Sequence, residues 1–358
     1  MPNLTLTLAD ARRLGRELFT AAGAPPDEAA LVTEELIDAS LMGLDSHGLL
    51  RFGEYANWAR EGRVKPGAPA TIVSETATTA IVECGMNFGQ VSAAFMVNLA
   101  RDKAAAAGMA GVVSRNCGHV GRLGAWPQKL AEQGLMGLAF TNSTRHGHWV
   151  APFGGREGRL ATNPLAYAVP MSGQPLVMDM STSMIAEGKI RVLMHQGKPI
   201  PPGAVIDADG QPTTDPKAFY GPPHGWILPF GGDLGYKGFG LSLLVEIMGG
   251  LLGGFASTEN GHHINGFCIL AIDPDKFCGR ARFQELVDDL AAYIRSTPPL
   301  AEGGEVVLPG TLDFRNRARR LAEGLPLPET TWRQIEQAAA ALNLDLGWAR
   351  AGFAQSLS

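Results

Sequence analysis

The sequence predicts a mixed α/β fold in which a helical N-terminal region is joined by a C-terminal helix. Apolar residues recur at helical spacing before residue 45, and segments typical of strands and helices alternate from about residue 70. Hydrophobic residues make up 45% and charged residues 18% of the 358 residues, so the chain is globular and long enough for two or three domains.

Two helices are predicted in the N-terminal region. Leu14 and Leu18 lie on one face of the first helix, which Gly23 ends. The second helix begins at the Pro-Pro-Asp-Glu run 25–28, where a proline and acidic side chains suit a first turn. This helix runs into residues 45–47, which are therefore expected at a helix end or bend.

In the remainder of the chain, segments with the apolar spacing of strands alternate with segments that have the apolar spacing of helices. This order predicts at least one βαβ-like unit. Strands are predicted at 70–84 (two runs around a polar turn), 111–115, 137–143, 163–170, 175–181 and 266–273. Helices are predicted at 90–107, 123–133, 184–195, 239–252 (a buried helix), 280–295 (amphipathic) and 331–342. Residues 199–216 are predicted to form a long proline-rich loop.

The composition excludes several classes of function. A formal net charge of −5, without a run of lysines or arginines, provides no basic face for nucleic acid. The longest apolar stretch, 241–256, is interrupted by Glu246 and by glycines, so no membrane span is predicted. The N-terminus lacks the apolar segment of a secretion signal, and the four cysteines are widely spaced, as is typical of a cytoplasmic protein with reduced thiols.

Common catalytic motifs are also absent. The sequence contains no Rossmann GxGxxG motif, no P-loop and no GxSxG motif. Two histidine pairs, 146/148 and 262/263, lack the spacing and third ligand of a zinc site, so no metal is predicted. Lys237, which lies between glycines just before a predicted helix, could meet a phosphate, although these glycines are also explained by a tight turn.

The segment DSHGLLR places His47 beside Ser46 and four residues before Arg51. An imidazole exchanges protons near neutral pH, and a guanidinium suits a carboxylate. The same residues are also explained as a helix-end histidine and a solvated arginine. A second histidine, His119, lies in a glycine-rich loop after a predicted strand, where catalytic groups are common but where it could simply cap a turn.

An acidic side chain interrupts the apolar strand around Asp179. Such a carboxylate is usually paired with a histidine, an arginine or a ribose hydroxyl, although it can also cap the end of a strand. Arg156, Arg159, Thr162 and Asn163 add polar groups that could line the same cleft.

Seven segments in this order resemble the malate/L-lactate dehydrogenase family over roughly residues 5–325: DSHGLLR, SRNCGHVGRLG, TNS, VAPFGGREGRLATNPLAYAVP, DMSTSMIAEGKI, PIPPGAVIDADGQPTTDP and GYKGFGLSLLVEI. That family includes ureidoglycolate, sulfolactate and diketogulonate dehydrogenases and reductases of piperideine- and pyrroline-2-carboxylate. The resemblance implies a non-Rossmann NAD(P)-binding fold with a mixed, predominantly antiparallel sheet. It also implies a homodimer or a higher homo-oligomer. Residues 1–70 are expected to pack with 312–358 as a helical unit, and 71–311 to carry the site.

The resemblance also implies roles for individual residues. His119 would be the acid/base that takes the hydroxyl proton during oxidation, and Ser46, His47 and Asp179 would form a proton relay. The substrate carboxylate would contact Arg51 and Thr162. Contacts to the cofactor would come from His47, Ser143, Asp179, Met180, Ser181, Lys237 and Gly310.

Two departures from the family pattern concern specificity. Arg122 in HVGRLG puts a second cation near the expected substrate end, which would favour a dicarboxylate or a bulky polar acid. Glu187 stands where several members carry a basic residue or histidine. If its carboxylate faces the adenosine ribose, it would repel a 2′-phosphate and favour NAD over NADP.

The expected activity is therefore NAD(P)-dependent interconversion of a small 2-hydroxy acid and its 2-keto acid. Within the same class, the alternative is an NADPH-dependent reductase of cyclic imino acids, because reduction of C=N and C=O needs the same hydride geometry and a proton donor. From another class, the alternative is a non-catalytic protein that binds a small anion.

Overall fold

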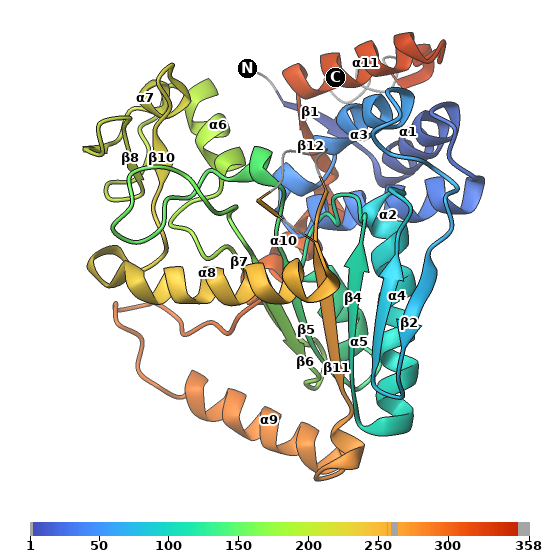
Figure 1. Cartoon of the computed structure of the whole chain (residues 1–358), viewed down its shortest axis with the longest axis vertical. Coiled ribbons are helices and arrows are strands. Elements are labelled where there is room, and N and C mark those ends of the chain that lie inside the picture. The colour runs from blue at the N-terminus through green and yellow to red at the C-terminus, as the bar shows by residue number, and fades with distance from the viewer. Residues whose placement is uncertain (1–2, 256, 259–263, 350–358) are drawn as a thin grey trace.

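The computed structural model describes residues 3–255, 257–258 and 264–349. Four helices form one layer of the protein (Figure 1). They are α1 (Leu8–Ala21), α2 (Pro26–Leu41), α3 (Arg51–Arg60) and α11 (Glu329–Ala341). Strand β1 (Asn3–Leu6) pairs antiparallel with β12 (Leu325–Pro328), which joins the two ends of the chain.

This layer has its own hydrophobic core. Leu18 and Phe52 from the N-terminal helices pack in one buried cluster with Trp332 and Ile335 from α11. Phe88 belongs to the same cluster although it comes from the region 71–311. The two regions thus share packing, and the division of the chain into 1–70 with 312–358 and 71–311 stays a prediction.

A seven-stranded sheet forms the centre of the molecule, in the order β2-β3-β4-β11-β5-β6-β7. Its strands are β2 (Thr71–Glu75), β3 (Thr79–Glu83), β4 (Met109–Arg115), β11 (Phe267–Ile272), β5 (Met136–Thr141), β6 (Leu165–Val169) and β7 (Leu176–Met180). Only β3 and β4 are parallel neighbours within it, and α4 (Gly89–Ala107) connects them as the predicted βαβ-like unit. The predicted mixed, predominantly antiparallel sheet is confirmed.

Helices cover both faces of this sheet because the strands alternate in side-chain direction. Val112 points toward Met96 of α4 and Trp126 of α5 (Ala125–Ala131) in one cluster. Its neighbour Val113 points to the opposite face, where it packs with Val245 of α8 (Gly235–Gly249). Figure 1 shows α8 lying across this second face, with α9 (Arg280–Arg295) further down.

A smaller unit lies beside α8 and contains the proline-rich segment. Residues 199–216 include β8 (Val205–Ile206) and β9 (Pro212–Thr213) rather than a continuous loop, and β8 also pairs with β10 (Trp226–Ile227). Helices α6 (Glu187–His195) and α7 (Pro216–Tyr220) complete the unit around a core that contains Ile190, Phe219 and Ile227.

The expectation that 239–252 forms a buried helix is wrong in two respects. Helix α8 begins at Gly235 and ends at Gly249, and large apolar side chains on it are exposed, among them Leu244 (46%) and Ile247 (49%). A helix that is apolar all round cannot bury every face against one sheet. The amphipathic helix α9 also leaves Leu290 exposed (57%).

Helices α3 and α10 (Thr311–Glu323) were not expected from apolar periodicity. Helix α10 carries more charged than apolar residues, and α3 is only ten residues long, so the helical state of both depends on packing against α1, α2 and α11. None of the helices in the described ranges is long and apolar enough to cross a membrane.

Candidate active site

The structure brings the two predicted histidines together. His47 lies in a short 3₁₀ turn, Asp45–His47, between α2 and α3, and His119 lies in the loop after β4. Their rings stack with centroids 5.6 Å apart and an interplanar angle of 19°. The site is therefore built where the helical layer meets the end of a central strand.

Close backbone packing fixes the turn that carries His47. The Ser40 hydroxyl accepts a hydrogen bond from the Leu49 amide (2.9 Å), and Asp45 is paired with Arg320 of α10. A Cβ on Gly48 would lie 2.0 Å from the Ser40 hydroxyl oxygen, so only glycine fits there. The chain therefore turns after α2, as the sequence predicted.

His47 is held in a neutral state. The Ser46 hydroxyl lies 3.0 Å from its Nδ1. Desolvation, followed by the positive charges of Arg51 and Arg122, lowers the pKa of His47 to about 3. Burial, and then the two guanidiniums, disfavour a further positive charge, so the neutral imidazole is the favoured form of His47 at neutral pH.

Arg51 is already engaged on two sides. Its Nε donates to the Ser46 carbonyl (2.8 Å), and one terminal nitrogen forms an ion pair with Glu54. The side chain is 20% exposed. A carboxylate that binds this guanidinium would share it with Glu54 or displace it.

The His119 ring is held by Tyr55, to which the sequence analysis gave no role, and by the backbone of Gly121. The Tyr55 hydroxyl lies 2.5 Å from Nδ1 of His119 and accepts a hydrogen bond from the Gln90 side chain (3.2 Å). The Gly121 amide donates to the same Nδ1 (3.2 Å). Burial raises the pKa of Tyr55, so its hydroxyl keeps its proton. Tyr55 follows Arg51 by four residues, and this same-face spacing was the available signal.

Glycines allow the loop around His119 to approach the start of α4. A Cβ on Gly89 would lie 2.3 Å from the His119 carbonyl oxygen, and one on Gly118 would lie 2.5 Å from the Asn87 carbonyl oxygen. Real Cβ atoms do not come this close to backbone. The glycine-rich sequence around His119 is thus explained by packing.

Asp179 lies in β7, opposite Ala166 of β6. One of its carboxylate oxygens accepts a hydrogen bond from the Gly124 amide (2.7 Å). Desolvation raises the pKa of Asp179, although the Gly124 amide and Arg122 lower it in part. Within the described part of the chain, no hydrogen bond joins this carboxylate to Ser46 or His47, so the three residues of the expected relay are not connected directly.

Arg122 is the buried cation of the site. It is 5% exposed, and its two terminal nitrogens donate to the Gln128 side-chain oxygen at 3.0 and 2.5 Å. Its charge lowers the pKa of both His47 and Asp179. From one fixed position, this guanidinium therefore influences both His47, beside the helical layer, and Asp179 in β7.

The loops that carry the remaining site residues are joined by one buried carboxylate. Glu246 of α8 is 7% exposed and accepts hydrogen bonds from Asn142 and Asn163, both at 2.8 Å. Asn265 donates to the Asn142 carbonyl (2.8 Å) and accepts from the Val120 amide (3.2 Å). This network holds the neighbours of Ser143, Thr162 and His119 against α8.

The expected cofactor residues lie on adjoining segments. Met180 ends β7, and the next residue, Ser181, donates to the Ser183 carbonyl (3.1 Å). Gly310 precedes α10 with φ +86°, and a Cβ there would lie 2.9 Å from the Val177 carbonyl oxygen of β7. Thr162 is tied to the same region, since its carbonyl accepts from the Thr182 amide (3.0 Å).

Lys237 lies in the first turn of α8 rather than in a loop before it, and it is exposed. A Cβ on the next residue, Gly238, would lie 2.1 Å from the Phe230 carbonyl oxygen, which explains this glycine by packing. Glu187 is paired with Arg191 (2.8 Å) and accepts from the Tyr220 hydroxyl (2.8 Å). Its charge is thus compensated, which weakens the expectation that it favours NAD.

No group of three or more potential metal ligands is present in the described ranges. His146 and His148 line a separate cavity, whereas the pair 262/263 lies outside the described residues.

Comparison with known proteins gives consistent matches over almost the whole chain. The family model described as malate/L-lactate dehydrogenase matches residues 6–336. An L-sulfolactate dehydrogenase of Methanocaldococcus jannaschii is 34% identical over 94% of this chain and 96% of its own length. An L-lactate dehydrogenase of Cupriavidus necator is 34% identical over 95% and 99%. The crystal structure of a delta1-piperideine-2-carboxylate reductase from Pseudomonas syringae superposes with a TM-score of 0.82 and 30% identity, covering 94% of this chain and 99% of that chain.

We predict that His47 takes up no proton from about pH 8 down to about pH 5, because its pKa in the folded chain is lowered from 6.5 to about 3. The unfolded chain does take up this proton, so the free energy of unfolding should fall as the pH drops below about 6.5. NMR of labelled histidines, with the His47 signal assigned through His47→Gln, measures the first effect. A His47 titration midpoint above pH 5 would contradict the prediction.

Proposed function

This chain belongs to the malate/L-lactate dehydrogenase family, and we propose that it interconverts a small 2-hydroxy acid and its 2-keto acid. The observation that carries the proposal is the stacked pair of His47 and His119 beside the guanidiniums of Arg51 and Arg122. Cations fixed next to an oriented imidazole suit a substrate that is an anion and that exchanges a proton.

We assign the proton exchange at the substrate oxygen to His119. Tyr55 and Gly121 orient its ring through Nδ1, which lowers the cost of placing the imidazole against the substrate. His47, neutral and bonded to Ser46, packs against that ring. Asp179 completes the proposed relay, with its raised pKa suited to holding or passing a proton.

We assign the substrate carboxylate to Arg51 and Thr162. In this assignment Glu54 holds Arg51 in position before the substrate arrives. Arg122 contributes positive charge, and this charge favours substrates with a second acidic group.

NAD or NADP is the proposed cofactor, and it would supply or accept the hydride when bound. The donor set fits a dinucleotide, because the exposed ammonium of Lys237 lies at the N-terminus of α8, where backbone amides favour phosphate. The other proposed contacts are those expected from the sequence: His47, Ser143, Asp179, Met180, Ser181 and Gly310.

NADPH-dependent reduction of a cyclic imino acid is the second candidate activity. Its support is the likeness to the piperideine-2-carboxylate reductase structure. Such a substrate also carries a carboxylate and needs a proton at the reduced bond, so the same residues would serve it.

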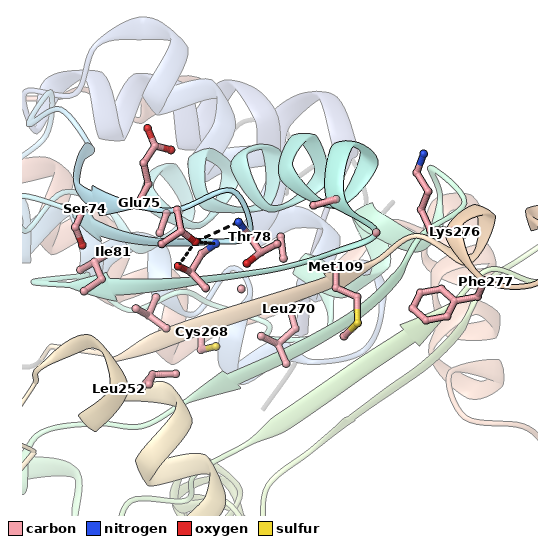
Figure 2. A pocket seen from close by; sticks show the side chains of 18 residues that line it. Ser74, Glu75, Thr78, Ile81, Met109, Leu252, Cys268, Leu270, Lys276 and Phe277 are labelled. Carbon is pink, nitrogen blue, oxygen red and sulfur yellow. Dashed lines mark hydrogen bonds between the residues drawn. The ribbon is translucent and has the colours of Figure 1, made fainter.

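We also propose that the protein is a cytoplasmic homodimer or higher homo-oligomer. The exposed apolar face of α8 continues through Leu252 into a cavity of about 750 Å³, on the sheet face near β4 and β11 (Figure 2). Met109, Leu270 and Phe277 line the same cavity. An apolar surface of this extent favours contact with a second copy of the chain. The cysteines in this region and elsewhere are free thiols, which fits a reducing compartment.

The activity is tested by following oxidation of NADH and NADPH with pyruvate, oxaloacetate, 2-oxoglutarate, phenylpyruvate and a cyclic imino acid. We expect turnover with a keto acid, and a loss of about 10²–10⁴-fold in kcat for His119→Ala. Turnover with the imine alone would support the second candidate. Near-normal turnover of a folded His119→Ala variant would contradict the acid/base role, and silence of the wild type throughout would favour a non-catalytic anion-binding protein.

Arg51→Lys should raise KM for the keto acid by about 10–100-fold, because lysine keeps the charge but loses the planar fork of the guanidinium. Steady-state kinetics measure the change. Arg60→Lys is the matched control on the same helix, since Arg60 is exposed (43%) and, within the described residues, its side chain bonds to its local neighbours Asn57 and Glu61. An unchanged KM in Arg51→Lys for every keto acid would contradict the carboxylate-binding role.

Leu244→Glu should shift the protein toward a smaller species in size-exclusion chromatography with light scattering, because a charge in an apolar interface is costly. Leu321→Glu, at a similarly exposed leucine (44%) on α10, is the control. A wild-type protein that elutes as a monomer would contradict the proposed homo-oligomer.

A further inference from the structure

We propose that a second cavity, outside the residues assigned to the reaction, binds an aromatic carboxylate that carries a hydroxyl group. The cavity has a volume of about 560 Å³ and is lined by Arg145, His148, Trp149, Arg159, His224 and Trp226, among others. This volume is typical of small-molecule sites. None of the catalytic, substrate or cofactor residues proposed above lines it.

The rim of this cavity is positively charged. Arg145 and Arg159 are both exposed, and no carboxylate belongs to the lining described here. Arg159 pairs with Glu157 (2.6 Å) in an exposed ion pair that contributes little, and its other terminal nitrogen donates to the Gly158 carbonyl (2.8 Å). Arg145 has no ion pair in the part of the chain that the structure describes. A carboxylate is therefore the group that this rim would recognise.

The walls are aromatic and held in place. Trp149 packs against Phe219 (ring centroids 5.7 Å apart) and against His224 (6.0 Å). The Trp226 ring lies over Gly158, where a Cβ would come within 2.6 Å of it, so only glycine allows the indole this position. Both indoles are half-buried, which leaves surface for a planar ring.

The floor carries a buried polar atom without a partner. His148 is 9% exposed, and its Nε2 has no hydrogen-bond partner. The ring bonds to the Ser143 carbonyl, and this bond must come from Nδ1 because Nε2 is unpaired. A neutral imidazole with its proton on Nδ1 presents a lone pair at Nε2. A buried acceptor left unsatisfied is costly, so a ligand hydroxyl that donates to it would bind favourably.

Depth therefore orders the chemistry of the cavity: guanidiniums at the rim, indoles in the walls, and one acceptor at the floor. A phenol that carries a carboxylate on the opposite side of the ring matches this order. The inference does not depend on the proposed dehydrogenase activity, because neither the cofactor nor a keto acid takes part in the binding.

The test is isothermal titration calorimetry of the full chain with 4-hydroxybenzoate, benzoate, 4-hydroxybenzyl alcohol and inorganic phosphate, without cofactor. We expect 4-hydroxybenzoate to bind tightest. Arg145→Gln should weaken 4-hydroxybenzoate by about 10-fold or more and leave the neutral alcohol unchanged. His148→Phe should lower the affinity for 4-hydroxybenzoate to that for benzoate. His148→Gln keeps a hydrogen-bond acceptor, so this variant should still bind 4-hydroxybenzoate somewhat more tightly than benzoate.

Arg156→Gln is the matched control, because Arg156 is an exposed arginine on the same segment that does not line the cavity. Three results would overturn the proposal: equal affinity for 4-hydroxybenzoate and inorganic phosphate, no effect of Arg145→Gln, or an unchanged preference for the hydroxyl in a folded His148→Phe variant. Since Arg145 is exposed, its substitution tests binding without threatening the fold.

Discussion

The architecture of the site depends on one buried carboxylate, that of Glu246. A charge that is 7% exposed must be compensated, and here the side-chain amides of Asn142 and Asn163 provide the compensation. Each asparagine immediately precedes or follows a segment that carries site residues, and Asn265 extends the network to the loop of His119. Both ends of the connection between β5 and β6 are thus fixed to α8, and Asn265 links the loop after β4 to them, which is why residues far apart in sequence keep a common geometry.

The electrostatics of the site follow from where its cations are placed. Arg122 is buried and Arg51 is largely so, and the stacked pair of His47 and His119 lies beside them. Positive charge is therefore concentrated on guanidiniums, which cannot lose it, and His47 is kept uncharged beside them. A site of this kind attracts small anions through its guanidiniums. The imidazole of His47, next to the bound anion, stays uncharged.

The spacing of apolar residues was sufficient to predict helices that pack by one face, as α1 and α4 do, and strands whose residues alternate in burial. It failed for α3 and α10, whose helical state depends on tertiary contacts, and for α8, because an apolar composition does not reveal which face has a neighbour. In the site, motif resemblance led to His47, His119 and Asp179. It did not lead to Tyr55, because the four-residue spacing from Arg51 indicates a shared helix face but does not show that the tyrosine hydroxyl meets an imidazole. The roles of these residues, and the domain boundaries, remain predictions.

The position of β11 has a consequence for synthesis on the ribosome. This strand, Phe267–Ile272, lies between β4 and β5, although both are made long before it. Until β11 emerges, the strands β2-β3-β4 and β5-β6-β7 cannot be joined into one sheet, and the edges of β4 and β5 that β11 will pair with stay unpaired. Such edges are templates for wrong pairing. Production of the protein is therefore most vulnerable late in translation, when a single strand must insert to close the sheet.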